Sequence, residues 1–294
     1  MLKGKIIKGI AGFYYVHTAE AGIYACKARG IFRRLGIKPL VGDMVELEVT
    51  DEKDKEGNIT KVLPRSSCLI RPACANIDQA LIIFAAASPD PNLNLLDRFL
   101  LLMRQQDLDT IICFNKEDLA GEEQTARLVD IYRDSGYRVL VTSVKEKQGL
   151  DQLRALLDGR TTAVAGPSGV GKSSLTNALY PDANMQTGAI SEKIGRGRHT
   201  TRHAELFYLG SGTYLMDTPG FSTIYLNGFE KEELRFYYPE FTSLAQDCRF
   251  QNDCSHISEP DCAVKKALEQ GRISRSRYDN YKLFYEEIAG MRKY

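Results

Sequence analysis

A glycine-rich run that ends in lysine and serine carries the clearest chemical signal in the sequence. It matches the pattern G-x-x-x-x-G-K-[ST], and with the serine that follows it comprises Gly166, Pro167, Ser168, Gly169, Val170, Gly171, Lys172, Ser173 and Ser174. Glycines allow backbone N–H groups to close around phosphate oxygens, a lysine brings positive charge to the β- and γ-phosphates, and the first serine hydroxyl binds Mg²⁺. A glycine-rich structural turn would not require the Lys-Ser ending. The run therefore predicts a site for a nucleoside triphosphate and Mg²⁺.

Two further loops would select the base of that nucleotide. The first matches N-K-x-D, the guanine-recognition sequence of GTPases, and comprises Asn115, Lys116, Glu117 and Asp118. The Asp118 carboxylate can accept hydrogen bonds from the ring N–H and the exocyclic amine of guanine, and adenine lacks this pair of donors. An isolated copy of this sequence is as often a helix cap, but beside a phosphate loop it favours GTP over ATP. The second loop is similar to the S-A-K loop that contacts guanine through its backbone, and comprises Thr142, Ser143, Val144 and Lys145.

Two loops downstream of the phosphate loop would bind Mg²⁺ and sense the γ-phosphate. Asp217 and Gly220 match D-x-x-G, in which the aspartate reaches Mg²⁺ through water and the glycine N–H contacts the γ-phosphate. A turn-forming D-T-P-G sequence is the alternative. A basic loop at 193–203 supplies a threonine for Mg²⁺, and the sequence does not separate Thr200 from Thr201.

The group that would orient the attacking water is not obvious from the sequence. Phe221 follows D-T-P-G, where many GTPases carry a glutamine, and an apolar ring cannot orient water. We therefore expect slow intrinsic hydrolysis, with the water positioned by His199 or by groups that a partner supplies in trans. A loop histidine that contacts RNA phosphate, or nothing, is an equally good interpretation of His199.

Three cysteines and a histidine have the types and spacing of a metal site near the carboxyl end. Cys248, Cys254, His256 and Cys262 lie within fifteen residues and form a Cys₃His set suited to tetrahedral Zn²⁺. Four protein ligands imply a closed, structural site. Buried free thiols are the alternative, but such a short polar segment has little core in which to bury them.

These motifs require elements that place them at one sheet edge, and the hydrophobic pattern provides them. About five short strands separated by glycines at 4–65 suggest a small antiparallel barrel of the OB type. From residue 76, apolar strands alternate with amphipathic helices, which is typical of a parallel α/β sheet. We expect strands at 79–86, 110–114, 138–142 and 161–165, and helices at 95–106, 122–135, 150–157 and 172–179. Two more strands are expected around 204–208 and 213–216, and the chain beyond Gly228 is polar and helical.

Composition excludes several classes of protein. The 294 residues, 43% hydrophobic and 26% charged, suit two or three folded domains rather than a disordered or fibrous chain. The longest apolar run, 80–87, is too short for a membrane helix, and the start shows no signal-type apolar segment, so we expect a cytoplasmic protein without a membrane partner. The net charge is +1, but the two ends of the sequence are basic, with net charges of +7 over residues 1–40 and +4 over 265–294. These basic segments either contact a polyanion such as nucleic acid or form a solvated surface.

The motifs occur in an unusual order. Small GTPases run from the phosphate loop through D-x-x-G to N-K-x-D, whereas this chain begins with N-K-E-D and ends with D-T-P-G. Because all these loops leave one rim of the same sheet, a cyclic permutation preserves the site. The order predicts a multidomain α/β protein with an OB-like barrel at 1–65, a circularly permuted P-loop GTPase domain at 66–225 and a helical zinc-binding domain at 226–294.

With the barrel before it and the Cys/His cluster after it, this permuted GTPase sequence resembles the ribosome small-subunit-dependent GTPase A family over essentially its whole length. The resemblance implies a monomeric GTP hydrolase that binds the small ribosomal subunit and its rRNA through the barrel and the zinc domain, late in maturation. The family pattern has four residues between the first two cysteines and this chain has five, so Cys248 needs a small adjustment of its loop.

Two functions from other classes compete with this interpretation. A P-loop ATPase or kinase would use the same phosphate loop, and Asp118 argues against it because the carboxylate favours guanine. An rRNA-binding module whose nucleotide site is a switch with negligible turnover would keep Lys172, Ser173 and Asp217, since these residues serve binding as well as chemistry. Only residues 221–229 separate D-T-P-G from the unit that carries the cysteine cluster, which suggests that the γ-phosphate is mechanically coupled to the zinc domain.

Overall fold

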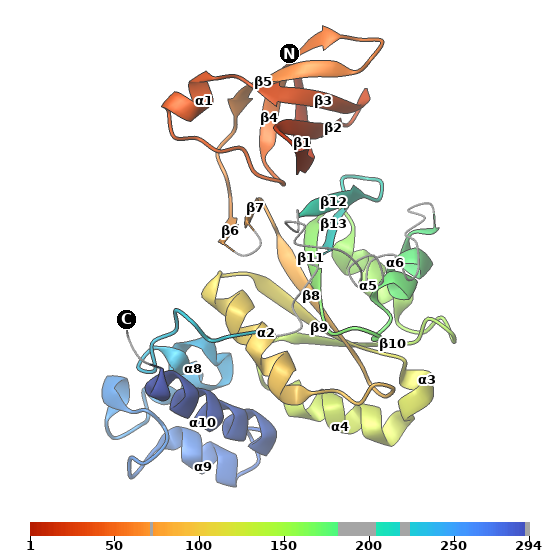
Figure 1. Cartoon of the computed structure of the whole chain (residues 1–294). Coiled ribbons are helices and arrows are strands. Elements are labelled where there is room, and N and C mark those ends of the chain that lie inside the picture. Colours follow the sequence, from red (N-terminus) through yellow and green to blue (C-terminus); the bar gives the residue numbers. More distant parts are fainter. Residues whose placement is uncertain (71–72, 182–203, 218–223, 292–294) are drawn as a thin grey trace. The chain divides into compact units, whose positions relative to one another are not determined.

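The computed structural model describes the chain except residues 71–72, 182–203, 218–223 and 292–294 (Figure 1). Its contacts divide the chain into two compact units. The first unit comprises Met1–Leu81, Asp151–Ala165 and Lys172–Gly220, and the second comprises Ile82–Leu150, Gly166–Gly171 and Phe221–Tyr294. Both units therefore combine segments that are far apart in the sequence.

Five strands of the first unit close into the small barrel that the sequence predicts (Figure 1). Their order is β1-β2-β3-β5-β4, β4 pairs back to β1, and only the β3–β5 pairing within the barrel is parallel. Apolar side chains at alternating positions fill the interior, among them Ile6, Val16, Tyr24, Leu47 and Ile59. The elements are β1 (Leu2–Ile10), β2 (Phe13–Thr18), β3 (Gly22–Ala28), α1 (Ile31–Arg34), β4 (Met44–Asp51) and β5 (Glu56–Val62).

The barrel is joined within the first unit to strands of the α/β part. Strand β1 meets β12 (Glu205–Tyr208) in antiparallel pairing at Lys8 and Glu205, whose side chains form an ion pair of 2.9 Å. β12 pairs with β13 (Tyr214–Asp217), and β13 runs parallel to β11 (Thr161–Ala165). His17 Nδ1 lies 2.8 Å from the Tyr214 hydroxyl, which adds a polar contact at the joint.

A short hairpin follows the barrel, formed by β6 (Cys68–Ile70) and β7 (Ala73–Ala75). Gly42 lies against it with a φ of +91°, and a Cβ there would be 1.9 Å from the Ala75 carbonyl oxygen. The hairpin and helix α1 were not expected from the sequence. The position of the hairpin depends on contacts with distant residues, such as the bridge between Val41 and Cys74, and no local sequence pattern reveals such contacts.

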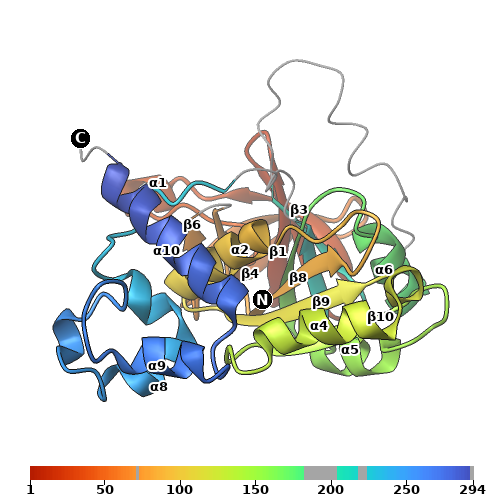
Figure 2. The ribbon, with the colours of Figure 1, turned by 90° about the horizontal axis from the view of Figure 1, so that it is seen from below.

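The second unit contains the other parallel strands, in the order β10-β9-β8. Asn115 on β9 is level with Thr142 on β10, so both strands end at the same rim. Helix α2 packs on β9 and α4 packs on β10 (Figure 2). The elements are the end of β8 (Gln79–Ala85), α2 (Leu93–Gln105), β9 (Asp109–Asn115), α3 (Glu117–Ala120), α4 (Glu122–Tyr132), β10 (Arg138–Thr142) and the start of α5 (Leu150–Leu157).

Most of the expected strands and helices of the α/β part are present, with shifted ends. Helix α2 begins two residues earlier than predicted because the Asn92 side chain accepts a hydrogen bond of 3.0 Å from the Leu95 N–H and caps the helix. Helix α4 ends at Tyr132 rather than Ser135. The Ser135 hydroxyl donates to the Tyr132 carbonyl, a local bond that competes with further helix.

The chain beyond Gly228 is helical, as expected, and packs around aromatic side chains. The largest buried ones are Tyr238, Phe241, Tyr281 and Phe284, with Cys248, Cys254 and Cys262 in the same core. Helix α10 lies along α2 (Figure 2). The elements are η2 (Leu234–Tyr237), α8 (Pro239–Ala245), η3 (Gln251–Asp253), α9 (Ala263–Glu269) and α10 (Arg275–Gly290). Over the described parts of the chain, none of the helices is both long and apolar enough to cross a bilayer.

Candidate functional site

Asn115 links the N-K-E-D loop to the glycine-rich run. Its Nδ2 donates a hydrogen bond of 2.9 Å to the Val170 carbonyl, and its Oδ1 accepts one of 3.0 Å from the Thr142 hydroxyl. The side chain is buried, with 2% of its surface exposed. Three of the predicted nucleotide loops are therefore held together by one amide.

Lys116 adds a second link between these loops. It has a φ of +63°, and its Nζ donates to the carbonyl oxygens of Gly169, at 2.7 Å, and Ser88, at 2.5 Å. Gln124 Nε2 donates to the neighbouring Ala86 carbonyl at 2.9 Å. The turn after β8 is thus part of the loop cluster. Sequence reasoning missed Ser88 and Gln124, because Ser88 and the partner of Gln124, Ala86, each contribute only a backbone carbonyl, which leaves no trace in the residue type.

Asp118 has a fixed orientation. Its Oδ1 accepts a hydrogen bond of 2.7 Å from the Ser143 hydroxyl, and Lys145 Nζ lies 3.9 Å from Oδ2. The Asp118 side chain is 10% exposed, so its carboxylate is largely shielded from bulk water. Glu117 begins helix α3, and Val144 lies between the two residues that contact Asp118. A carboxylate held in this way presents two acceptors in a fixed direction.

Two positions of the glycine-rich run exclude any side chain. A Cβ at Gly166, where φ is +143°, would lie 2.0 Å from the Ile83 carbonyl oxygen. At Gly171, where φ is +91°, it would lie 2.6 Å from Asn115 Nδ2. The backbone of the run therefore approaches β8 and the N-K-E-D loop more closely than other residues allow.

The remainder of the predicted phosphate site begins helix α6 (Lys172–Leu179), with Ser173 and Ser174 in its first turn. The first N–H groups of a helix point toward its start, where they can bind an anion. Asp217 ends β13 and is level with Val164 on β11, two residues before Gly166. Gly220, His199, Thr200 and Thr201 lie outside the described residues.

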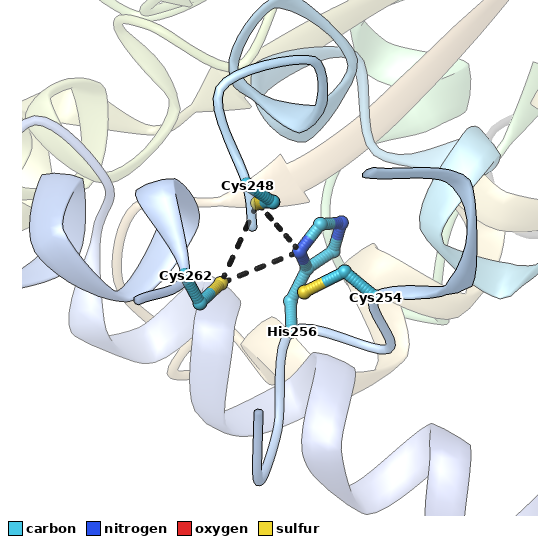
Figure 3. Close-up of side chains that lie close together, drawn as sticks. All are labelled: Cys248, Cys254, His256 and Cys262. Atoms are coloured by element: carbon cyan, nitrogen blue, oxygen red, sulfur yellow. Dashed lines mark hydrogen bonds between the residues drawn. The ribbon is translucent and has the colours of Figure 1, made fainter. Parts of the chain in front are cut away.

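The four predicted metal ligands converge in the helical region (Figure 3). His256 Nδ1 lies 3.6 Å from Cys248 Sγ and 3.4 Å from Cys262 Sγ, and these two sulfurs are 3.8 Å apart. All four ligand atoms, with Cys254 Sγ, lie within 4.8 Å of one another. A tetrahedron of Zn–S and Zn–N bonds of about 2.0–2.3 Å has edges of roughly 3.3–3.8 Å, so the cluster fits Zn²⁺. The extra residue after Cys248 does not displace it.

The protonation chemistry of the cluster also fits a cation. Burial raises the pKa of the Cys254 thiol to about 12, and burial together with Arg235 lowers the pKa of His256 to about 4. Neutral groups are therefore favoured there until a dication stabilises the thiolates. His256 Nδ1 faces the sulfurs, while the buried Nε2 has no hydrogen-bond partner among the described residues.

Neighbouring side chains hold the loop that carries His256. The Tyr278 and Tyr281 hydroxyls donate to the carbonyls of His256 and Ser255, at 2.7 and 2.5 Å, and both tyrosines come from α10. The Glu259 carboxylate accepts from the N–H groups of Ser255, at 2.7 Å, and Ile257, at 3.1 Å. These supports were not predicted, because tyrosines at helical spacing have the pattern of ordinary core residues.

The comparisons with known proteins agree with this architecture. The model of the RsgA GTPase family matches residues 62–227, and that of the RsgA N-terminal domain matches residues 3–59. A relative from Agathobacter rectalis described as small ribosomal subunit biogenesis GTPase RsgA is 56% identical over 303 residues, covering 100% of both chains.

Two solved structures are similar over nearly the whole chain. The crystal structure of YjeQ from Thermotoga maritima has a TM-score of 0.82 at 35% identity and covers 99% of both chains. The structure of YloQ, described as a circularly permuted GTPase, has a TM-score of 0.80 at 39% identity, over 100% of this chain and 97% of that one. The chain therefore belongs to the RsgA GTPase family, as its barrel, the permuted order of its loops and these matches show.

Proposed function

We propose that this GTPase of small ribosomal subunit biogenesis binds GTP at the loop cluster around Asn115, Lys116 and Asp118, and hydrolyses it with Mg²⁺. The observation that carries the proposal is the position of Asp118, whose carboxylate is fixed by Ser143 while Asn115 ties its loop to Val170. In this proposal, base recognition and the part of phosphate binding at 166–171 use loops that these hydrogen bonds hold together. A carboxylate in this position accepts from both guanine donors and has no equivalent pairing with adenine.

Phosphate and metal binding follow from the neighbouring elements. In this proposal the N–H groups of 166–171 surround the phosphates, Lys172 neutralises the β- and γ-oxygens, and Ser173 binds Mg²⁺ directly. Asp217, at the end of β13 and level with Val164 on β11, holds a water of the metal. Mg²⁺ supplies charge stabilisation for the phosphoryl group when bound.

The catalytic assignments rest on the sequence alone. We keep Thr200 or Thr201 as the second hydroxyl ligand of Mg²⁺, Gly220 as the γ-phosphate contact, and His199 or a group from the ribosome as the element that orients water. Phe221 has no polar atom for that task. The proposal therefore includes slow turnover by the protein alone and acceleration on its partner.

For the cysteine cluster we propose one structural Zn²⁺. Cys248, Cys254 and Cys262 would hold it through sulfur and His256 through Nδ1, which leaves no position for a substrate. Zinc there fixes the loop between α8 and α9. Its role in this proposal is to keep the helical region folded for contact with the small subunit.

The partner assignments extend the family relationship. We propose a cytoplasmic monomer that contacts the small subunit and its rRNA late in maturation through the barrel at 1–65 and the zinc domain at 226–294, which precede and follow the GTPase domain at 66–225 in the sequence. The basic ends support this proposal, because they carry an excess of lysine and arginine over acids.

The decisive experiment measures GTP hydrolysis by the full chain with and without purified small ribosomal subunits. ATP serves as the base control and Lys172→Ala as the phosphate-loop control. We expect stimulation of about 10³-fold or more, restricted to GTP and lost in the variant.

Other outcomes have distinct meanings. GTP binding without stimulated turnover would contradict catalysis on the ribosome and support a nucleotide switch. Equal use of ATP would contradict the role of Asp118. Stimulation by large subunits alone would contradict the proposed partner.

A further inference from the structure

Arg235 is a half-buried arginine of the helical region and belongs to none of the sequence motifs. It lies on η2 (Leu234–Tyr237), next to the fully buried Leu234, and its guanidinium carbon lies 4.6 Å from the centre of the Phe236 ring. Its Nε atom is buried without a hydrogen-bond partner, and among the residues that the structure describes no carboxylate pairs with the guanidinium. A positive charge taken out of water without a counter-ion is costly, so its position needs a reason.

The guanidinium holds the turn that carries Cys254. Its Nη1 donates a hydrogen bond of 2.8 Å to the Cys254 carbonyl, and its Nη2 donates to the Asn252 carbonyl. The two acceptors lie at the end of η3 (Gln251–Asp253), on either side of Asp253. A planar fork that bonds two carbonyls fixes both the position and the orientation of the backbone, which a single donor does not.

The backbone of this turn needs support from outside. Gln251 has a φ of +40° and His256 a φ of +61°, so a left-handed residue lies on each side of Cys254. Such conformations are unfavourable for residues with a side chain and persist where neighbouring contacts hold them. The bonds from Arg235 reach the stretch between these two residues. They therefore help to set where Cys254 Sγ, one of the four converging ligand atoms, lies.

The proposed zinc site also has a charge that Arg235 complements. A Zn²⁺ ion with three thiolates and a neutral histidine carries more negative than positive charge. Burying this excess charge is unfavourable unless positive charge lies beside it. Arg235 bonds the carbonyl of a ligand residue, Cys254, so its guanidinium lies within the length of one residue of the cluster. The unpaired guanidinium and the anionic site therefore offset each other.

Two other charged side chains contact the loop of His256, but among the described contacts neither bonds a ligand residue. Glu259 accepts from the N–H groups of Ser255 and Ile257 and adds negative charge. Lys265 Nζ donates to the Ile257 carbonyl at 3.4 Å, which is long for a hydrogen bond. Arg235 is therefore better placed than Lys265 to act on the site through Cys254.

We propose that Arg235 is a positioning residue of the zinc site, which fixes the turn of Cys254 and offsets the negative charge of the metal-bound thiolates. The inference rests on the proposed structural zinc and deepens that proposal. It assigns a role to a residue outside the Cys₃His motif, and it makes the affinity for zinc depend on η2, a segment that supplies no ligand.

The test measures the affinity of the full chain for Zn²⁺ by competition with a chromophoric chelator of known affinity. Arg235→Met keeps the apolar stem and removes the donors and the charge, and we expect the affinity for Zn²⁺ to fall about tenfold. Arg235→Lys keeps the charge but lacks the planar fork, so it should recover part of the loss. Arg272→Met is the control, because it removes an exposed arginine of the same region that bonds Gln270, and it should leave the affinity unchanged.

Melting temperatures with Zn²⁺ and with excess chelator provide a second measurement. Arg235→Met should lower the melting temperature of the zinc-loaded chain more than that of the zinc-free chain, since its role depends on the metal. The inference is overturned if this variant keeps the affinity of the wild type, or if it lowers both melting temperatures equally, as loss of a purely structural contact would.

Arg235→Lys carries the comparison if Arg235→Met does not fold. An affinity for Zn²⁺ equal to that of the wild type would then overturn the role of the fork. A lysine variant no better than the methionine variant would overturn the role of the charge. A wild-type chain that does not bind Zn²⁺ would instead refute the metal site itself.

Discussion

Asp118 illustrates how the role proposed for a single side chain depends on a neighbour. The Ser143 hydroxyl occupies one lone pair of Oδ1 at 2.7 Å and fixes the plane of the carboxylate. Two carboxylate oxygens in a fixed plane are complementary to the N1–H and 2-amino donors of guanine. In the proposed site, base selection would therefore depend on hydrogen-bond polarity rather than on the size of the pocket.

Asp118→Asn should reverse part of that polarity. The amide nitrogen would face a guanine donor, so we expect GTP affinity to fall by about 3 kcal/mol, on the order of a hundredfold. Xanthosine triphosphate carries a carbonyl in place of the 2-amino group and should bind the variant better than the wild type. Titration with labelled nucleotides measures both affinities, and undiminished GTP binding by the variant would exclude the carboxylate from base recognition.

Glu259 stabilises the cysteine-cluster loop in a pH-dependent way. Burial raises its pKa, but hydrogen bonds from Ser255 and from the backbone at 255 and 257 outweigh burial and lower the pKa from 4.5 to about 2. A carboxyl with a depressed pKa in the folded state contributes stability above its unfolded pKa, and the contribution is lost as the pH falls from about 4.5 toward 2.

Glu259→Gln should therefore lower the melting temperature at pH 7, and the difference from the wild type should shrink below about pH 4.5. Differential scanning calorimetry at pH 7 and pH 4 provides the comparison. The exposed Glu123→Gln on α4 serves as a matched control, with little difference at either pH. A Glu259→Gln difference that grows on acidification would contradict the assigned direction.

At the scale of elements, α10 is fixed to the rest of the second unit by a buried ion cluster. Arg277 donates to Asp97 Oδ1 on α2 at 2.7 Å and lies 2.8 Å from Glu240 Oε1 on α8. Asn280 donates to Asp97 Oδ2 at 2.6 Å. Because all three charged groups are nearly inaccessible to water, none tolerates the loss of its partner.

Arg277→Met should cost about 3–5 kcal/mol of unfolding free energy, since it leaves two carboxylates buried without their counter-ion. Urea unfolding followed by circular dichroism measures the cost. Arg127→Met, which breaks an exposed pair with Glu123, should cost less than about 1 kcal/mol. Similar values for the two variants would mean that the buried pair is not what fixes α10.

Sequence patterns predicted the elements best where a motif bounded them. The ends of β10, β11, α5 and α6 are as expected. In each of them a clear periodic pattern of apolar residues ends at a loop whose residue types are set by a motif or a turn. Helix α1 and the β6–β7 hairpin were missed, since they are short and depend on tertiary pairing. In the candidate site, the motifs led to described residues that lie together, such as Asn115 and Asp118, but supports such as Ser88 and Tyr278 contribute a carbonyl or a core hydroxyl that has no signature in the sequence.

At the scale of the whole molecule, the distribution of charge predicts how the protein meets its partner. The basic segments lie at both ends of the sequence, and the intervening residues are net acidic. Contacts of lysine and arginine with phosphates release counter-ions, so affinity falls linearly with salt on logarithmic axes.

Affinity for small subunits should therefore fall at least about tenfold between roughly 50 and 200 mM salt, with a steeper loss as more phosphates are contacted. Sedimentation with purified subunits measures it, and GDP affinity under the same conditions is the internal control. A flat salt response would mean that the basic ends are solvated and make no contact with rRNA.

The pairing of β1 with β12 has a consequence for biosynthesis. The five barrel strands lie within the first 62 residues, yet Glu205, the partner of Lys8, is made only 143 residues (205 − 62) after the last of these strands. At typical rates of translation this takes roughly 7–30 s. During that interval the barrel is a nascent domain with one edge of β1 unpaired near Lys8, and a lysine on an open edge disfavours pairing with other chains. Lys8, which later joins the barrel to β12 of the GTPase part, therefore first protects the barrel from pairing with other chains while the rest of the protein is being made.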